Sequence, residues 1–133
     1  MLDTQEECIA LLEKLRWDGQ PRCPYCDSIR AAPFKLEQRY HCNDCFTSYS
    51  VTVNTLFHRT RVDLAKWFQA IHLLLNEVRK VSARQLAQEI NVNKNTASYM
   101  KVRIRQAKKT EDLLLNELSK HLKATYIKLN NLV

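Results

Sequence analysis

The chain has 133 residues, of which 45% are hydrophobic and 26% are charged, a composition typical of a folded protein. This length predicts one ordinary domain or two very small ones rather than a large multi-domain enzyme. Its apolar runs are short, whereas a membrane span needs about 20 residues. Because the first residues are acidic and unlike a secretory signal, we expect a cytoplasmic protein without membrane contact.

The net charge of +7 is distributed unevenly along the chain. Residues 1–50 contain six basic and eight acidic side chains, whereas residues 51–133 contain fifteen basic and six acidic ones. A positive field concentrated in one part of a chain indicates a polyanionic partner, most often a nucleic acid.

The cysteines provide the most specific signal. Four of the five form two Cys-x-x-Cys pairs separated by fifteen residues, and they are Cys23, Cys26, Cys42 and Cys45. This spacing is typical of a zinc ribbon, because each short turn supplies two thiolates to a tetrahedral Zn²⁺. Four thiolates leave no position for a catalytic water, so we expect one structural zinc. Two disulfides are the alternative, which the reduced thiols of an intracellular protein disfavour.

The ribbon is expected over residues 21–56. Aromatic, aliphatic and β-branched residues predict short antiparallel strands there, and they are Phe34, Leu36, Tyr40, Tyr49, Val51 and Val53. Such a small unit buries too little surface to fold without a metal. We expect His41 to be a strand residue rather than a ligand, and Cys8 to be a buried, unreactive thiol on a helix.

Helices are predicted on both sides of the ribbon. Thr4 and Glu7 form a capping-box signature for a helix that ends near Arg16, and Ser82 with Gln85 marks the start of another. Between them, apolar residues recur at helical spacing, and they are Leu64, Trp67, Phe68, Ile71, Leu74, Leu75 and Val78.

The tripeptide Asn91-Val92-Asn93 interrupts the helical pattern. Asn91 tolerates the left-handed conformation of a tight turn, and Asn93 can cap a helix that begins at Lys94. The apolar residues of this last helix lie on one face, and they are Ala97, Met100, Ile104 and Ala107. The segment therefore predicts a helix-turn-helix within a helical domain over residues 57–109.

The opposite face of the helix 94–106 is polar and has a cationic rim, as a helix in the major groove of DNA requires. Residues 61–109 also contain eleven basic and only three acidic side chains. The predicted base contacts are Lys94, Asn95, Ser98 and Tyr99. The predicted phosphate contacts are Arg84, Lys101, Arg103 and Arg105. Arg59 and Arg61, between ribbon and helices, are candidates for an adjacent groove.

The tail over residues 110–133 is a leucine-rich helix. Its leucines follow a heptad pattern for fewer than three heptads, and they are Leu115, Leu118, Leu122, Leu129 and Leu132. The tail either pairs two protomers in a homodimer or folds back onto the helical domain, and the sequence leaves both open.

Together these motifs resemble the N-terminal part of insertion-sequence transposases that carry a zinc ribbon followed by a helix-turn-helix, over about residues 5–107. The strings that carry the resemblance are Leu15-Arg16-Trp17, the two cysteine pairs, Ser50-Val51-Thr52-Val53, Lys66-Trp67-Phe68, Gln85-Leu86-Ala87, Lys94-Asn95-Thr96 and Arg103-Ile104-Arg105. Asp27, Asn54 and Asn91 replace glycines of that family, and all three tolerate left-handed geometry. The family continues into a catalytic domain with two metal ions, which we expect this chain to lack.

We therefore expect an α+β, mostly helical protein with an N-terminal helix over residues 1–20 and the three parts given above. The leading hypothesis is a transposase-derived protein that binds double-stranded DNA, without catalytic residues, as a transcriptional regulator or DNA-targeting module. The alternative is an interaction module that binds a protein partner such as a transposase, polymerase or nuclease, because the acidic ribbon half is poorly suited to phosphate.

Overall fold

The computed structural model describes residues 4–34, 37–76 and 80–131, with side chains described as far as residue 126. The chain forms two compact units, residues 2–61 and residues 62–133. Within the described ranges, no helix combines the length and the apolar character that crossing a membrane requires.

The first unit begins with helix α1, Gln5–Trp17. The Thr4 side chain accepts a hydrogen bond from the Glu7 backbone N–H at 3.2 Å, so the helix starts where the sequence predicts. The helix ends at Asp18, which adopts a left-handed conformation with φ 49°. Cys8 is fully buried on its inner face, as predicted.

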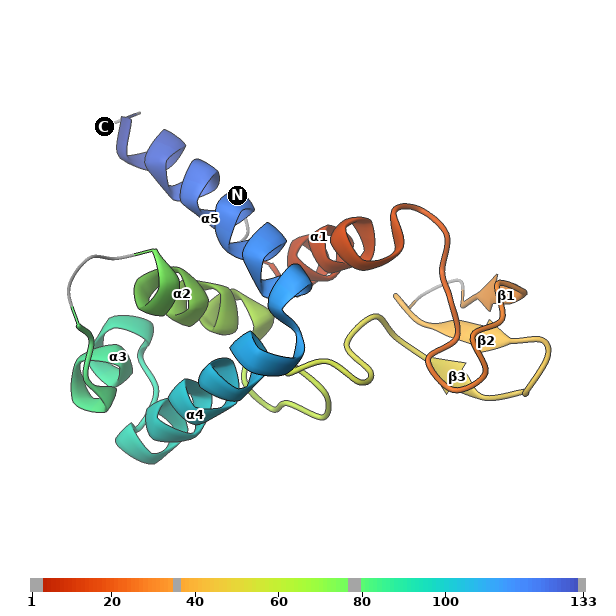
Figure 1. Cartoon of the computed structure of the whole chain (residues 1–133), viewed down its shortest axis with the longest axis horizontal. Helices are drawn as coiled ribbons and strands as arrows, with labels where there is room; N and C mark the ends of the chain where they lie inside the picture. Colours follow the sequence, from red (N-terminus) through yellow and green to blue (C-terminus); the bar gives the residue numbers. More distant parts are fainter. Residues whose placement is uncertain (1–3, 35–36, 77–79, 132–133) are drawn as a thin grey trace. The chain divides into compact units, whose positions relative to one another are not determined.

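A small sheet follows in the same unit (Figure 1). Its strands β1 (Ala31–Pro33), β2 (Tyr40–Cys42) and β3 (Ser48–Tyr49) are antiparallel in that order. The register pairs Ala32 with His41 and His41 with Ser48, so His41 is a strand residue as predicted.

The prediction of strand residues at Phe34, Val51 and Val53 is wrong. Phe34 lies just beyond β1, and Val51 and Val53 lie in turns after β3. The backbone carbonyls of both valines accept hydrogen bonds from Arg16 of α1, at 2.7 and 2.9 Å, instead of pairing with a further strand. Leu36 lies outside the described residues.

The second unit consists of four helices: α2 (Leu64–Leu75), α3 (Ala83–Ile90), α4 (Lys94–Thr110) and α5 (Asp112–Asn131). Helix α2 contacts the other three, and α4 contacts both α3 and α5. Their core consists of large apolar side chains that are almost fully buried, including Trp67, Phe68, Ile71, Leu86, Met100 and Ile104. The mostly helical fold with one small sheet confirms the predicted α+β class. Val78, predicted on α2, lies outside the described residues.

The tail of the chain folds back within this unit. Leu115, Leu118 and Leu122 are fully buried, and α5 contacts α2 and α4. The heptad pattern left open whether the tail pairs two protomers or folds back onto the helical domain. These three leucines pack within the helical domain. The side chains of Leu129 and Leu132 lie outside the described residues.

Candidate metal centre and nucleic-acid interface

The four predicted metal ligands converge at one point. The sulfur atoms of Cys23, Cys26, Cys42 and Cys45 all lie within 4.8 Å of one another. The Sγ–Sγ distances are 3.6 Å for Cys23–Cys45 and 3.5 Å for Cys26–Cys42. A tetrahedron with Zn–S bonds of about 2.3 Å has sulfur–sulfur edges of about 3.8 Å, so the cluster has the size and donor set of a structural zinc site.

The two cysteine turns have the same backbone geometry. In the first, the Asp27 N–H donates to the Cys23 carbonyl and the Cys23 N–H donates to the Ser28 carbonyl, both at 2.9 Å. In the second, Phe46, Cys42 and Thr47 make the two equivalent bonds, again at 2.9 Å. The residue after each second cysteine is left-handed, with φ 65° at Asp27 and 62° at Phe46. Each turn therefore presents its two thiols from one loop.

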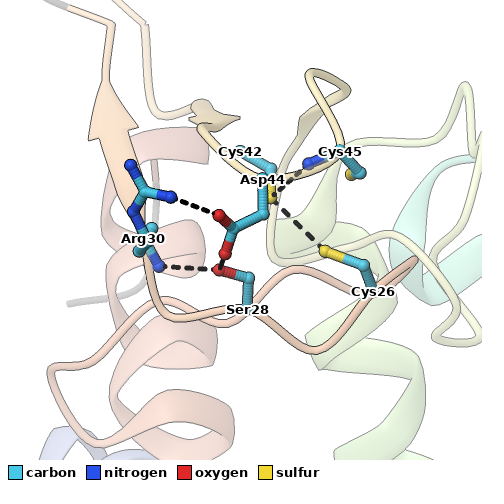
Figure 2. A network of polar contacts seen from close by, with 6 residues as sticks. All are labelled: Cys26, Ser28, Arg30, Cys42, Asp44 and Cys45. Atoms are coloured by element: carbon cyan, nitrogen blue, oxygen red, sulfur yellow. Dashed lines mark hydrogen bonds and ion pairs between the residues drawn. The ribbon is translucent and has the colours of Figure 1, made fainter.

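Asp44 links the two turns directly (Figure 2). Its carboxylate accepts hydrogen bonds from the Ser28 hydroxyl and from the Arg30 guanidinium, both of which follow the first turn. The Ser28 hydroxyl also accepts from the Arg30 backbone N–H at 3.1 Å. The hydrogen bond from Ser28, together with Arg30, holds the pKa of Asp44 below its usual range, so this carboxylate is charged at neutral pH.

The hydrogen bonds and sulfur contacts of the cluster give its thiols different pKa values. The backbone N–H groups of Cys45 and Asp44 lower the pKa of Cys42 to about 6. For Cys26, the backbone hydrogen bond with Ser28 lowers the pKa, but the neighbouring sulfurs and desolvation outweigh it and raise the pKa to about 12. Because zinc requires all four thiolates, its binding releases protons from this cluster.

The end of α1 is fixed to the ribbon by a feature that the sequence analysis missed. The Trp17 ring meets Tyr40 and Tyr49 edge-on, with centroid distances of 5.6 and 5.8 Å, and the two tyrosine rings stack at 5.8 Å. Tyr49 is fully buried in one cluster with Cys23 and Cys42. The Leu15-Arg16-Trp17 string, noted only as part of the family resemblance, thus completes the wall of the metal centre. Only the short separation of this string from the first cysteine pair in the sequence could have indicated that Trp17 packs beside the metal centre.

The predicted caps of α3 and α4 are present, with a left-handed residue between the two helices. Ser82 and Gln85 form both bonds of a capping box at the start of α3. Asn91 is left-handed with φ 57°, and its carbonyl accepts from the Lys66 ammonium group at 3.0 Å. The Asn93 side chain accepts from the Thr96 N–H at 2.8 Å and so caps α4.

The predicted DNA contacts differ in exposure. The exposed ones are Arg84, Lys94, Asn95, Tyr99 and Arg105, and the half-buried ones are Ser98, Lys101 and Arg103. The Lys101 ammonium group donates to the Val81 carbonyl at 2.9 Å and thereby joins α4 to the start of α3. Arg59 and Arg61 are exposed, but they belong to the unit of residues 2–61.

Comparisons with known proteins agree with this architecture. Residues 3–48 match the family of the transposase zinc-ribbon domain. A protein of Halobacterium salinarum, described as an uncharacterized protein in transposable element ISH50, is 35% identical over 89 residues. The alignment covers 65% of this chain but only 30% of that relative. No solved structure matches the chain significantly.

These findings define a protein with a four-cysteine ribbon built for a structural zinc. The ribbon is of the transposase zinc-ribbon type, and the chain is similar to a protein of an insertion-sequence element, as its motifs predicted.

Proposed function

We propose that the chain binds double-stranded DNA by inserting α4 into the major groove, with α3 and α4 as a helix-turn-helix. The observation that carries this proposal is the geometry of α4. Its inner face is buried in the helical unit, whereas Asn95, Tyr99 and Arg105 are exposed on its outer face. A helix whose first turn is fixed by a side-chain cap and a tight turn offers a rigid surface to base edges.

In this proposal the side chains divide their roles by position. Asn95, Ser98 and Tyr99 face the base edges together with Lys94, because amide and hydroxyl groups match the donors and acceptors of the major groove. Arg84 and Arg105 contact phosphates, with Arg103 at the other edge of α4. Lys101 contributes charge next to the groove while it remains bonded to Val81.

The same proposal assigns no catalytic step to this chain. In it, the chain acts as a transcriptional regulator or as a DNA-targeting module derived from a transposase. The ribbon supplies a second, zinc-stabilised unit. Because Leu115, Leu118 and Leu122 are buried within one chain, a homodimer through residues 110–133 would need the rest of the tail.

The ribbon favours a second candidate function, binding to a protein partner. Several large apolar side chains are exposed on the unit of residues 2–61: Tyr25, Ile29, Phe34 and Phe46. Phe46 is 76% exposed. Its backbone is left-handed, which is unfavourable for an aromatic residue. Exposed apolar side chains together with the acidic balance of residues 1–50 suit a protein surface better than phosphate.

A titration against DNA at several salt concentrations tests the first proposal against the second. Zinc-loaded protein is titrated with random-sequence duplexes and with duplexes from its own genomic locus. If about six phosphates are neutralised, the logarithm of affinity falls with the logarithm of salt with a slope of about −5. A weak, salt-independent signal would favour the protein-binding module instead.

Two variants test the proposed roles within α4. Asn95→Ala should weaken binding to the preferred site by about 1–3 kcal/mol and relax specificity. Arg105→Ala should weaken binding to all sequences and reduce the salt slope by about one. Equal behaviour of the two variants would contradict this placement of α4 in the groove.

A further inference from the structure

The outer face of α4 exposes two apolar side chains that the helical unit does not bury. Val102 is 48% exposed and Tyr99 is 53% exposed, although their neighbours Met100 and Ile104 are almost fully buried. Val also has a lower helix propensity than most residues, so it gains little at an exposed helical position by propensity alone. These two residues are therefore candidates for contact with a partner.

Helical spacing places them on the same line as the proposed base-reading residues. Asn95, Tyr99 and Val102 lie at i, i+4 and i+7, and Ser98 lies beside them at i+3. At 1.5 Å per residue, Asn95 and Val102 are separated by about 10.5 Å along the axis, which corresponds to about three base-pair steps of 3.4 Å. The line can thus follow a short run of consecutive base pairs.

Between Asn95 and Val102, the charged residues of α4 lie at the edges of this line rather than on it. Lys94 and Arg105 flank it on one edge and Arg103 on the other, while the line itself carries an amide, two hydroxyl groups and an isopropyl group. Guanine is read most often by a bidentate Arg or Lys, whereas adenine is read by Asn and the thymine methyl group by apolar contact. The chemistry of the line therefore matches A·T pairs better than G·C pairs.

A ring contact positions one of the two apolar residues. The Tyr99 ring meets the buried Trp67 ring edge-on, with a centroid distance of 6.4 Å and an interplanar angle of 72°. Because Trp67 is held in the core, this contact limits the freedom of Tyr99 and leaves less conformational entropy to lose on binding.

We propose that α4 recognises an A·T-containing run of base pairs, in which Val102 is a specificity-determining residue that contacts a thymine 5-methyl group and Tyr99 supports it. The inference rests on the proposed function, and it adds a base preference and a residue that reads it. Asn95 pairs with adenine in the same run, two helical turns before Val102.

Replacing thymine by uracil tests this directly, because deoxyuridine removes only the methyl group and keeps the base pair. Preferred sites are first selected from a random duplex pool with zinc-loaded protein. Each thymine of the selected core is then replaced singly by deoxyuridine. We expect one replacement to weaken binding of the original protein about fourfold, as the loss of one buried methyl group implies.

The variant Val102→Ala makes the test specific, because alanine preserves the helix and removes the contacting methyl groups. The same replacement should then change the affinity of Val102→Ala by less than about 1.5-fold, a non-additivity that identifies direct contact. Leu113→Ala is the matched control, since Leu113 is also an exposed apolar residue of this unit, at 84%, and its substitution should leave the deoxyuridine effect unchanged.

The outcomes separate this inference from the proposed function. Sequence-selective, salt-dependent binding that is indifferent to every deoxyuridine replacement, or a selected core of G·C pairs, would overturn the thymine contact and leave DNA binding intact. Absence of salt-dependent binding to any duplex would overturn both. Self-association that Val102→Ala abolishes, without effect on DNA, would assign the exposed residues to a contact between copies of the chain.

Discussion

Single residues with left-handed backbones determine how several segments of the chain turn. Asp27, Asn54 and Asn91, which were predicted to tolerate left-handed geometry, adopt it with φ angles of 65°, 61° and 57°. Asp and Asn accept this conformation at lower cost than other side chains. At Asn91 the turn determines how α4 is oriented against α3, and hence which residues α4 exposes.

Asn91→Ala should destabilise the helical unit by about 1 kcal/mol, because alanine lacks the tolerance of asparagine for positive φ. Asn91→Gly is the matched control and should retain stability to within about 0.5 kcal/mol, since glycine adopts this conformation freely. Urea unfolding of the zinc-loaded proteins, followed by far-UV circular dichroism, measures both. Equal destabilisation by Ala and Gly would indicate that the asparagine side chain, rather than its backbone, stabilises the turn.

At this scale the sequence predicted side-chain chemistry better than unusual geometry. The four cysteines, and the Thr4, Ser82 and Asn93 caps, could be assigned because their spacing alone specifies the bonds they make. Phe46 could not be predicted to be left-handed, since an aromatic residue rarely adopts positive φ and only the turn of the second cysteine pair imposes it. The bonds from Arg16 to the Val51 and Val53 carbonyls span more than thirty residues and leave no local pattern.

Among the secondary-structure elements, the sequence predicted the helices more accurately than the strands. Side-chain caps mark the starts of α1, α3 and α4, and an apolar period marks α2, so all four helices were located by local signals. The strands have only two or three residues, and their positions depend on the metal site and on α1 rather than on alternation. The heptad pattern of α5 had two solutions, because an apolar stripe does not specify which surface covers it.

The burial of the α5 leucines gives a second prediction at the element scale. Leu118→Ala should destabilise the helical unit by about 3 kcal/mol, the usual cost of removing a buried leucine side chain. Leu113→Ala should change stability by less than about 0.5 kcal/mol, since Leu113 is exposed. Chemical denaturation at two protein concentrations measures both effects. A midpoint that rises with protein concentration and is lowered equally by the two variants would mean that α5 packs against a second chain.

At the scale of the whole molecule, the two units are stabilised by different means. The ribbon core contains metal ligands, Cys23 and Cys42, packed with Tyr49, and so depends on metal binding for much of its folding energy. The helical unit has a core of Trp67, Phe68, Leu86 and Ile104, none of which can hold a metal. The proposed DNA-reading surface belongs to this second unit.

Zinc removal should therefore unfold the ribbon and spare the helices. After chelation at neutral pH, hydrogen exchange should show loss of protection in β1 to β3 and retained protection in α2 to α5. Cys23→Ser with Cys26→Ser should reproduce this pattern, whereas Cys8→Ser should retain the metal, because Cys8 lies on α1 outside the four-sulfur cluster. Metal content retained by the double variant would contradict the zinc site, and loss of protection in α2 to α5 would contradict independent stability of the helical unit.

If the helices remain folded, salt-dependent binding to random duplexes should persist with a similar slope, since the proposed phosphate contacts Arg84 and Arg105 belong to α3 and α4.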